Sequence, residues 1–417
     1  MKDLVIQRDY CFSIEGRERP LEREVALITG SSREIGAGTA IALAGEGVRI
    51  IGNHRDPSLG KAKRAEGVRM AIEQVGVQVD FVQADITVRE DRERLGKALE
   101  AFGGKLDFLI LNTSGNAQTA RQVCVEANNA LVDEFLPRMN EGGRIILMQS
   151  VPGHFDPQLR GLGKMPSFYD PIAQAKYEGE QSLRARIPKL QEKGVNLLLV
   201  CPPEVEDTSN MRLFRRLDKS ISEKHAEISD MLGIPGSVTI DQVGQKVAEL
   251  LKRKDLPSGY VELFSNVLDA RSVLSEWYGD NAIFVDTLEI VDENRGIGRM
   301  IVAKEYTRGH FNDRVEMSLL PGHIMIEAAA QTLGLTALNG KIDGNSMPMF
   351  QGIGNVQFLK TVRPGEGLKI HTELTEQSRR EFVGNVYITN MQDEKVAEIN
   401  GLEAMVINRD VARRLLR

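Results

Sequence analysis

Short apolar runs that alternate with helical patterns constrain the first half of this chain more than any other feature. Residues 24–29 form a β-rich run that passes directly into a glycine turn at 30–36 and then into an Ala-rich helical pattern. Further runs of the same kind lie at 48–53, 80–83, 106–112, 143–150 and 195–203. Strands that alternate with helices form a parallel sheet with helices on both faces. The sequence therefore predicts an α/β, doubly wound parallel sheet.

The glycine turn is the first candidate binding site. A tight turn between a strand and a helix brings backbone N–H groups and the positive end of the helix dipole together, where they can hold a pyrophosphate. The turn reads Thr-Gly-Ser-Ser-Arg-Glu-Ile-Gly from Thr29, and Asn-Thr-Ser-Gly follows the fourth run from Asn112. Over residues 21–265 these motifs resemble the short-chain dehydrogenase/reductases, and the ketoreductases in particular. The resemblance implies a Rossmann-type domain that binds a nicotinamide dinucleotide.

The resemblance assigns cofactor contacts to the turn, to the ends of neighbouring strands and to one lysine. They are Thr29, Gly30, Ser32, Arg33, Ile35, Gly36, Asn53, Arg55, Asp85, Ile86, Asn112, Gly115 and Lys176. Arg55 follows the second strand, where an NAD enzyme of this family would present Asp or Glu, and Arg33 lies in the turn. Guanidinium groups bind phosphates through paired N–H donors, so the predicted cofactor is NADPH. A solvated loop arginine is the alternative for Arg55, because exposed arginines are common.

The same family supplies a candidate catalytic set of Ser, Tyr and Lys. Ser150 ends its strand and matches the hydroxyl that holds the substrate carbonyl, and Lys176 matches the lysine that lowers the pKa of the tyrosine. Tyr169 is the expected proton donor, although Tyr-x6-Lys replaces the Tyr-x3-Lys of ketoreductases. Asp170, followed by a proline, predicts a helix start. Tyr169 is therefore expected in the loop just before the helix.

Departures from the ketoreductase pattern keep other interpretations open. Tyr-x6-Lys is the spacing of the enoyl-carrier-protein reductases, so the first domain could act on a 2-enoyl group. Ser150 and Tyr169 also lie farther apart than is usual in the family. Glu34 replaces the middle glycine of the turn, and its carboxylate would repel a pyrophosphate unless it turns outward or pairs with Arg33. The domain could therefore also be a degenerate binding or assembly module.

A histidine and a carboxylate in the second half are placed to move two protons. His310 lies between a glycine and a phenylalanine, and Glu327 lies in an apolar helical pattern at 324–335. Because nearly every side of this helix is apolar or small, we expect it to be buried all round and Glu327 to be a proton donor in a dry place. The helix should begin with Pro321 as its first residue, so that the N–H of Gly322 can hold an oxygen that gains charge. A core histidine and a satisfied buried glutamate are the alternative.

Motifs from residue 282 onward have a fixed order. They are Gly-His-Phe at 309–311, Pro-Gly-x4-Glu-Ala-x-Ala-Gln from Pro321, Phe-Gln-Gly-Ile-Gly-Asn from Phe350 and Val-Arg-Pro-Gly-Glu from Val362. Together they resemble the hot-dog-fold 3-hydroxyacyl-carrier-protein dehydratases of fatty-acid synthesis. The resemblance implies an α+β domain, an antiparallel sheet wrapped on a central helix, and a dimer across which His310 and Glu327 remove water. The loop at 312–320 is longer than in the family, which leaves the acyl chain length open.

The length of 417 residues exceeds a single core, so two domains are expected. We predict a nucleotide-binding domain at 1–265, in which residues 1–20 add a strand. A linker follows at 266–281, and the hot-dog domain occupies 282–417. Alternating patterns at 368–374, 382–388 and 394–407 favour antiparallel strands in that second domain.

Composition excludes several classes of function. A net charge of −6 argues against nucleic acid as a partner. No apolar run reaches the roughly 18–20 residues of a membrane span, and the N-terminus has no signal-peptide core. Cys11, Cys124 and Cys201 have neither paired nor metal-ligand spacing, which predicts no metal site and a reducing compartment, with the cytoplasm as the default.

We therefore predict a bifunctional enzyme that reduces a 3-oxoacyl group with NADPH and then dehydrates the 3-hydroxyacyl product to a 2-enoyl group. Its substrate would be a thioester of acyl-carrier-protein or CoA, and the resemblances imply a homodimer or homotetramer. The basic segment at 204–224 resembles the substrate loop of reductases and would either meet an acidic carrier or form a solvated helix face. The alternatives are a dehydratase joined to an enoyl reductase, a dehydratase joined to a non-catalytic domain, and a hot-dog thioesterase.

Overall fold

A computed structural model describes residues 21–55, 59–206, 208–308, 318–339, 346–378 and 381–408. The chain forms two compact units. The first comprises residues 1–154, 168–220 and 237–262, and the second comprises 155–167, 221–236 and 263–417. Within the described ranges, no helix combines the length and the apolar character that crossing a membrane requires. The N-terminal strand predicted at 1–20 lies outside the described residues.

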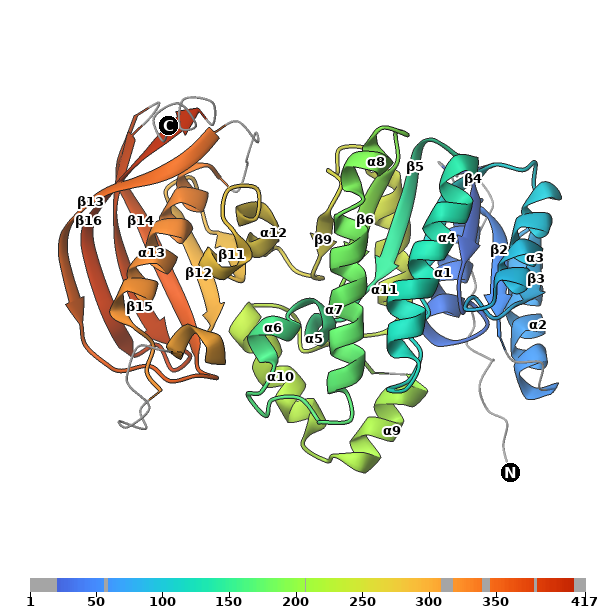
Figure 1. The fold of residues 1–417 in the computed structure, drawn as a ribbon, viewed down its shortest axis with the longest axis horizontal. Coiled ribbons are helices and arrows are strands. Elements are labelled where there is room, and N and C mark those ends of the chain that lie inside the picture. Colours follow the sequence, from blue (N-terminus) through green and yellow to red (C-terminus); the bar gives the residue numbers. More distant parts are fainter. Residues whose placement is uncertain are drawn as a thin grey trace. The chain divides into compact units, whose positions relative to one another are not determined.

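A seven-stranded parallel sheet forms the centre of the first unit (Figure 1). Its order is β3-β2-β1-β4-β5-β6-β9, so the chain runs from β1 outward to β3 and then returns to β4 on the other side of β1. This reversal places a topological switch point beside the end of β1, the usual ligand position in such sheets. The predicted doubly wound sheet is confirmed. The strands are β1 Val25–Ile28, β2 Arg49–His54, β3 Val79–Gln83, β4 Leu106–Leu111, β5 Met139–Met148, β6 Asn196–Val200 and β9 Tyr260–Glu262.

Helices cover both faces of this sheet (Figure 1). The longer ones are α1 Glu34–Gly45, α2 Leu59–Gln74, α3 Arg89–Glu100, α4 Asn128–Phe135, α7 Asp170–Arg184 and α11 Ile240–Lys252. Shorter elements are η1 Gln122–Ala127, η2 Leu136–Arg138, α5 Val151–His154, α8 Ile187–Gln191, α9 Ser209–Leu217 and the strand pair β7 Glu204–Val205 and β8 Ser237–Val238. Helices α1 and α11 pack closely because a Cβ at Gly38 would lie 2.4 Å from Ile240 Cγ2. Only glycine permits this approach.

The second unit contains a seven-stranded sheet whose order is β10-β11-β12-β14-β15-β16-β13 and whose neighbours pair antiparallel. The sheet curves around helix α13 Gly322–Ala337, as predicted for a hot-dog domain (Figure 1). Pro321 is the N-cap of α13 and not its first residue, since its ψ of 140° is extended. The other elements are β10 Leu268–Asp269, α12 Ala270–Leu274, η3 Asp280–Ala282, β11 Thr287–Ile290, β12 Arg295–Ile301, η4 Lys304–Thr307, β13 Ser346–Phe358, β14 Gly367–Gln377, β15 Glu381–Asn390 and β16 Lys395–Asn408.

Two early segments of the chain belong to the second unit, which differs from the predicted division at residue 265. One contains α6 Asp156–Leu159 and the other contains α10 Ile221–Leu232. The end of α10 is fixed to β11, because the Thr287 hydroxyl donates to the carbonyl of Leu232 at 2.8 Å. Segment 155–167 accounts for the long separation of Ser150 and Tyr169. The predicted linker at 266–281 also contains β10 and α12 of the second unit.

A buried charge pair holds the beginning of the second unit together. Asp286 is fully buried and accepts hydrogen bonds from the backbone N–H of Ile301 at 2.6 Å and from the Arg271 guanidinium at 3.3 Å. Burial raises the pKa of Asp286 to about 6, and the positive charge of Arg271 opposes this rise. Arg271 also donates to the Ile283 carbonyl at 3.0 Å. The guanidinium therefore offsets the cost of a buried carboxylate.

Replacing Arg271 by Met should lower the free energy of unfolding of the second unit by about 3 to 5 kcal/mol, because the carboxyl of Asp286 loses its buried counter-charge. A buried acid with a raised pKa is tolerated when protonated, so the loss should be larger at pH 8 than at pH 5. Fluorescence of Trp277, the single tryptophan, follows unfolding in urea because this residue packs against the core of the second unit.

Arg295→Met is the matched control for this substitution. Arg295 pairs with Asp292, and both side chains are exposed, so the change should leave the free energy of unfolding nearly unchanged at either pH. Equal losses for Arg271→Met at pH 5 and pH 8 would contradict the account of Asp286.

Candidate active sites

The glycine turn after β1 is fixed by two asparagines. The side-chain oxygen of Asn53 accepts from the N–H of Gly30 at 3.2 Å, and its amide donates to the Ala84 carbonyl at 2.8 Å. The amide of Asn112 donates to the carbonyl of Thr29 at 3.0 Å. Asn53 and Asn112 were predicted as cofactor contacts. The structure places them as supports that join the turn to β2, β3 and β4.

The backbone of the turn packs closely against its neighbours. Gly30 has a φ of +66°, which glycine adopts freely, and a Cβ there would lie 2.7 Å from the Thr113 hydroxyl. A Cβ at Gly36 would lie 2.4 Å from the Gly30 carbonyl oxygen. The Thr113 hydroxyl is buried and has no hydrogen-bond partner among the described residues. An unpaired buried hydroxyl beside the turn fits a polar ligand there.

The other predicted cofactor residues surround the same strand ends. Asp85 follows β3 and accepts from the Thr87 hydroxyl at 2.7 Å, and the Arg55 guanidinium lies 3.9 Å from its carboxylate. The Arg55 side chain is 62% exposed, so it remains accessible to a phosphate. Arg33 is exposed. Thr29, Ser32 and Ile86 are buried, Ile35 is half-buried, and Gly115 has a φ of +70°.

Glu34 has a partner that the sequence did not indicate. Its carboxylate accepts from the backbone N–H of Ser209 at 2.7 Å and also from the Ser209 hydroxyl. The sequence predicted that Glu34 either turns outward or pairs with Arg33, so that its charge avoids a pyrophosphate. Its contact with Ser209 is neither of these. The residue begins α1 with a φ of +51°, in the left-handed region that favours glycine.

Ser150 and Tyr169 are brought together, with their side-chain oxygens 3.1 Å apart. Ser150 follows the end of β5, and Tyr169 is the N-cap of α7, so the tyrosine lies just before the helix as predicted. Burial raises the pKa of Tyr169 to about 12, against the opposing effect of the Ser150 hydrogen bond. The phenol therefore stays protonated near neutral pH, and both hydroxyls can donate to a carbonyl oxygen.

Lys176 does not contact the tyrosine in this arrangement. Its ammonium donates to the carbonyl of Met148 at 3.2 Å, and among the described residues no hydrogen bond joins it to Tyr169. Burial lowers the pKa of Lys176. An effect of Lys176 on the pKa of Tyr169 stays a prediction; Tyr169 precedes α7, and Lys176 lies within it.

An aromatic side chain from α9 covers the tyrosine. The rings of Phe214 and Tyr169 meet edge to face with centroids 5.7 Å apart, and Phe214 also packs on Phe168 at 5.0 Å. The sequence analysis did not single out Phe214. The sequence pattern that could have indicated this residue is a phenylalanine within a strongly amphipathic helix.

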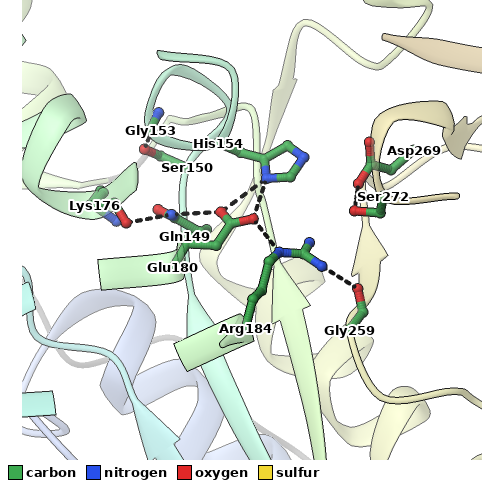
Figure 2. Close-up of polar contacts among 10 residues, drawn as sticks. All are labelled: Gln149, Ser150, Gly153, His154, Lys176, Glu180, Arg184, Gly259, Asp269 and Ser272. Carbon is green, nitrogen blue, oxygen red and sulfur yellow. Dashed lines mark hydrogen bonds and ion pairs between the residues drawn. The ribbon is translucent and has the colours of Figure 1, made fainter. Parts of the chain in front are cut away.

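A buried carboxylate fixes the backbone on both sides of this site (Figure 2). Glu180 of α7 is 1% exposed and accepts from the Gln149 amide at 2.9 Å and from the Arg184 guanidinium at 2.8 Å. Its two oxygens lie 2.9 Å from His154 Nδ1. Burial alone would raise the pKa of Glu180, but His154 and Arg184 outweigh it and the pKa is lowered. The ionised carboxylate therefore ties β5 and α5 to α7.

This network acts next to both catalytic candidates. Gln149 directly precedes Ser150, and its amide also donates to the backbone carbonyl of Lys176 at 2.9 Å. Arg184 donates in addition to the carbonyl of Gly259, just before β9 (Figure 2). The positions of Ser150 and Lys176 thus depend on side chains that the sequence analysis did not single out.

In the second unit, Glu327 lies on α13 and is half-buried. The prediction of a helix buried all round was wrong, because His323 is exposed and Ile326, Glu327 and Ala330 are half-buried along one face. The amide of Gln331 donates to Glu327 at 3.1 Å and to the Ala282 carbonyl at 2.6 Å. Gln331 is itself buried and therefore orients the carboxylate.

Gly322 is the first residue of α13, so its N–H lies at the helix start as predicted. A Cβ at this position would lie 2.6 Å from the ring of Phe358, which therefore packs directly on the helix start. His310 lies outside the described residues, and its separation from Glu327 stays a prediction. Across the described ranges, no cluster of His, Cys, Asp or Glu could hold a metal ion.

Two separate parts of the chain match known families. Residues 24–162 match the family model of short chain dehydrogenases, and residues 294–400 match the model of the FabA-like domain. Two separate parts of the chain are therefore similar to short chain dehydrogenases and to FabA-like domains.

Relatives resemble the two halves separately. A hydroxynaphthalene reductase of Aspergillus fumigatus is 33% identical over 153 residues, which are 32% of this chain and 55% of that protein. A 3-hydroxyacyl-[acyl-carrier-protein] dehydratase FabZ of Bacillus thuringiensis is 33% identical over 96 residues, which are 22% of this chain and 65% of that protein. The chain thus spans between half and two thirds of the length of these curated relatives.

Among solved structures, a short chain dehydrogenase from Burkholderia cenocepacia in complex with NADP is 22% identical, with a TM-score of 0.47 over 59% of this chain and 98% of that one. A carveol dehydrogenase from Mycobacterium avium in complex with NAD is 21% identical, with a TM-score of 0.49 over 59% of this chain and 97% of that one.

Replacing Glu180 by Gln should lower the free energy of unfolding by about 3 kcal/mol at pH 7, because Arg184 and His154 lose a buried counter-charge. An acid whose pKa is lowered on folding stabilises the folded state above its ordinary pKa of 4.5 and loses this effect as the pH falls. The difference from the wild type should therefore shrink below pH 4.5. Calorimetry of both proteins across this range measures it.

Glu178→Gln on the same helix is the control. Glu178 is partly exposed and lies 3.4 Å from Arg121, so this change should cost less than about 1 kcal/mol. A Glu180→Gln variant as stable as the wild type at pH 7 would rule out the tying role of the carboxylate.

Proposed function

We propose that this chain is a bifunctional enzyme that reduces a 3-oxoacyl thioester with NADPH and dehydrates the resulting 3-hydroxyacyl thioester to a trans-2-enoyl thioester. The observation that carries the reductase half is the 3.1 Å contact of the Ser150 and Tyr169 hydroxyls. Joining the two domains has a chemical reason, since the product of the first reaction is the substrate of the second. The names of the relatives, a reductase and a dehydratase, support the same pair of reactions.

The residues of the turn fit a nicotinamide dinucleotide. The N–H groups at the start of α1 and the unpaired hydroxyl of Thr113 would face the pyrophosphate. Arg55, whose side chain is largely exposed, and Arg33 would hold a 2′-phosphate, which favours NADPH over NADH. Bound NADPH supplies the hydride.

In the reduction, the chain's own residues handle the carbonyl oxygen. Ser150 would donate a hydrogen bond to this oxygen and hold it beside Tyr169. Tyr169, which stays protonated because burial raises its pKa to about 12, would transfer its proton to the oxygen as the oxygen gains charge. The product is a 3-hydroxyacyl thioester.

In the dehydration, His310 would remove a proton from the carbon next to the thioester carbonyl. The N–H of Gly322, at the positive end of α13, would stabilise the oxygen that gains charge. Glu327, oriented by Gln331, would protonate the departing hydroxyl as water. The carrier is proposed to be acyl-carrier-protein or CoA, in keeping with the name of the FabZ relative.

A second candidate reaction for the first unit is reduction of the 2-enoyl product. The Tyr-x6-Lys spacing favours it, since Tyr169 precedes α7 while Lys176 lies within the helix. In that case the order would be dehydration followed by reduction. Oxidation of NADPH with a 2-enoyl thioester and not with a 3-oxoacyl thioester would identify this reaction, and release of free thiol would instead identify a thioesterase.

We also propose that a second copy of the chain covers the edge of the hot-dog sheet, because the resemblance places His310 and Glu327 of different copies together. Strand β13 is one of the two edge strands of this sheet, and its Phe350 and Phe358 are 46% and 47% exposed. The half-buried face of α13 that carries Glu327 also needs a cover if its carboxyl is to be dry. An exposed apolar edge is a pairing surface.

The test of the two reactions uses one substitution in each site. Tyr169→Phe should lower NADPH oxidation with a 3-oxoacyl thioester by at least about 100-fold, and Glu327→Gln should lower enoyl formation from a 3-hydroxyacyl thioester by a similar factor, since each removes a general acid. Each variant is the control for the other. Tyr169→Phe should keep the dehydration, and Glu327→Gln should keep the reduction. Cofactor absorbance and mass spectrometry of the thioesters measure both, and a wild type that forms no enoyl product would refute the scheme.

The test of the assembly is Phe350→Glu, which should halve the particle mass in light scattering by placing a charge in an apolar contact. Dehydration should be lost while NADPH oxidation continues. Val291→Glu, at an apolar residue of the second unit that is 46% exposed and lies outside β13, should change neither property. A wild type that is monomeric would disprove the shared site.

A further inference from the structure

Glu34 joins two segments that are 175 positions apart in the sequence. Its carboxylate accepts the backbone N–H of Ser209 at 2.7 Å and the Ser209 hydroxyl, and Ser209 is the first residue of α9. A second N–H of that helix end, on Met211, is capped by the Thr208 hydroxyl at 3.2 Å. A carboxylate at a helix N-terminus is stabilised by the free N–H groups and by the dipole. Glu34 therefore holds α9 against the glycine turn.

The backbone at Glu34 shows that this contact is maintained against a local cost. A φ of +51° is free for glycine and unfavourable for glutamate. Such a conformation persists where surrounding contacts determine it, and it is found most often at functional sites. The two hydrogen bonds to Ser209 are the contacts that fix the side chain here.

Helix α9 carries the effect of Glu34 to the proposed catalytic tyrosine. Phe214 lies on this helix and packs edge to face on Tyr169, with centroids 5.7 Å apart. The Arg215 guanidinium donates to Glu204, which anchors the other end of the helix. One line of contacts thus runs from Glu34 through α9 to Tyr169.

The same turn would hold the pyrophosphate of the cofactor. Glu34 is the first residue of α1, so its side chain leaves the backbone at the helix start whose N–H groups the proposed function assigns to that anion. Two negative groups at one helix end repel each other strongly where water is excluded. The groups that hold the carboxylate, an N–H and a hydroxyl of Ser209, are neutral. They can therefore release it without leaving a buried cation.

We propose that Glu34 is a positioning residue that couples the cofactor turn to the tyrosine, so that a pyrophosphate displaces its carboxylate from Ser209 and frees α9 from Tyr169. The proposal rests on the proposed function, because it takes NADPH as the ligand of the turn. Without the nucleotide, Phe214 covers the tyrosine. With the nucleotide bound, the helix can move and admit the thioester.

Three variants separate the charge of Glu34 from its hydrogen bonds. Glu34→Gln keeps an oxygen acceptor and removes the charge. Glu34→Gly removes both and suits the positive φ, and Ser209→Ala removes only the hydroxyl donor. Glu206→Gln is the control, because this substitution changes the net charge by the same amount as Glu34→Gln. Glu206 also precedes α9, but it accepts from the Ser237 hydroxyl.

The first readout is the dissociation constant of NADPH, measured by fluorescence titration. Removing the repelling charge should tighten binding by about tenfold in Glu34→Gln and Glu34→Gly. Ser209→Ala should tighten it by a smaller factor, since only one of the two bonds that pyrophosphate must break is gone. Glu206→Gln should bind as the wild type does. Unchanged affinity in Glu34→Gln would refute the displacement.

The second readout is hydrogen exchange of residues 209–217, with and without NADPH. Exchange of the nucleotide-free protein should be faster in Glu34→Gly than in the wild type, and NADPH should accelerate exchange in the wild type but not in Glu34→Gly. Equal exchange of Glu34→Gly and the wild type without NADPH would overturn the coupling. Slower exchange of the wild type with NADPH than without it would also overturn the coupling.

The two readouts distinguish this proposal from the proposed function. If the wild type oxidises NADPH with a thioester and Glu34→Gln has unchanged affinity, the reductase assignment stands and the coupling falls. If no variant binds NADPH, both the reductase assignment and the displacement fall. Faster exchange in the nucleotide-free Glu34→Gly protein would then show only that Glu34 holds α9.

Discussion

The candidate reductase site depends on one buried carboxylate. Glu180 accepts from Gln149 and Arg184 and lies against His154, so a single side chain joins the end of β5, the helix α5 and the middle of α7. A buried charge of this kind is costly unless every oxygen is paired, and here the pairing partners come from each element that must be fixed. Ser150 and Lys176 take their positions from this network. The chemistry of the site is therefore set by residues that touch no substrate.

The order of residues along the chain does not follow the two compact units. Segments 155–167 and 221–236 lie within the reductase half of the sequence and belong to the second unit. Contacts such as the Thr287 hydroxyl to the Leu232 carbonyl and Lys164 to Glu227 fix these segments there. The second unit therefore includes chain from both halves of the sequence, whereas the first unit lies within residues 1–262. The long separation of Ser150 and Tyr169 is a consequence of this arrangement.

Much of the candidate site was predictable because its signals are local. The glycine turn, the strand before Ser150 and the loop position of Tyr169 each follow from residues within a few positions of one another. The helix of Glu327 was predicted, but its burial was overestimated, since apolar composition does not reveal which face another segment covers. The supporting contacts of Asn53 and Asn112 were not predicted, because they join segments far apart in the sequence: Asn53 donates to the Ala84 carbonyl and Asn112 to the Thr29 carbonyl.

The sequence by itself determined the order of strands and helices, the two families and the side chains that carry the proposed chemistry, because periodicity and turn residues act over short distances. Only the tertiary structure decided the partners of the buried and partly buried polar groups. Glu34 with Ser209, Glu180 with His154 and Gln331 with the Ala282 carbonyl are pairs from separate elements. A buried polar group must find a partner wherever packing brings one, and no local pattern specifies which distant residue that is.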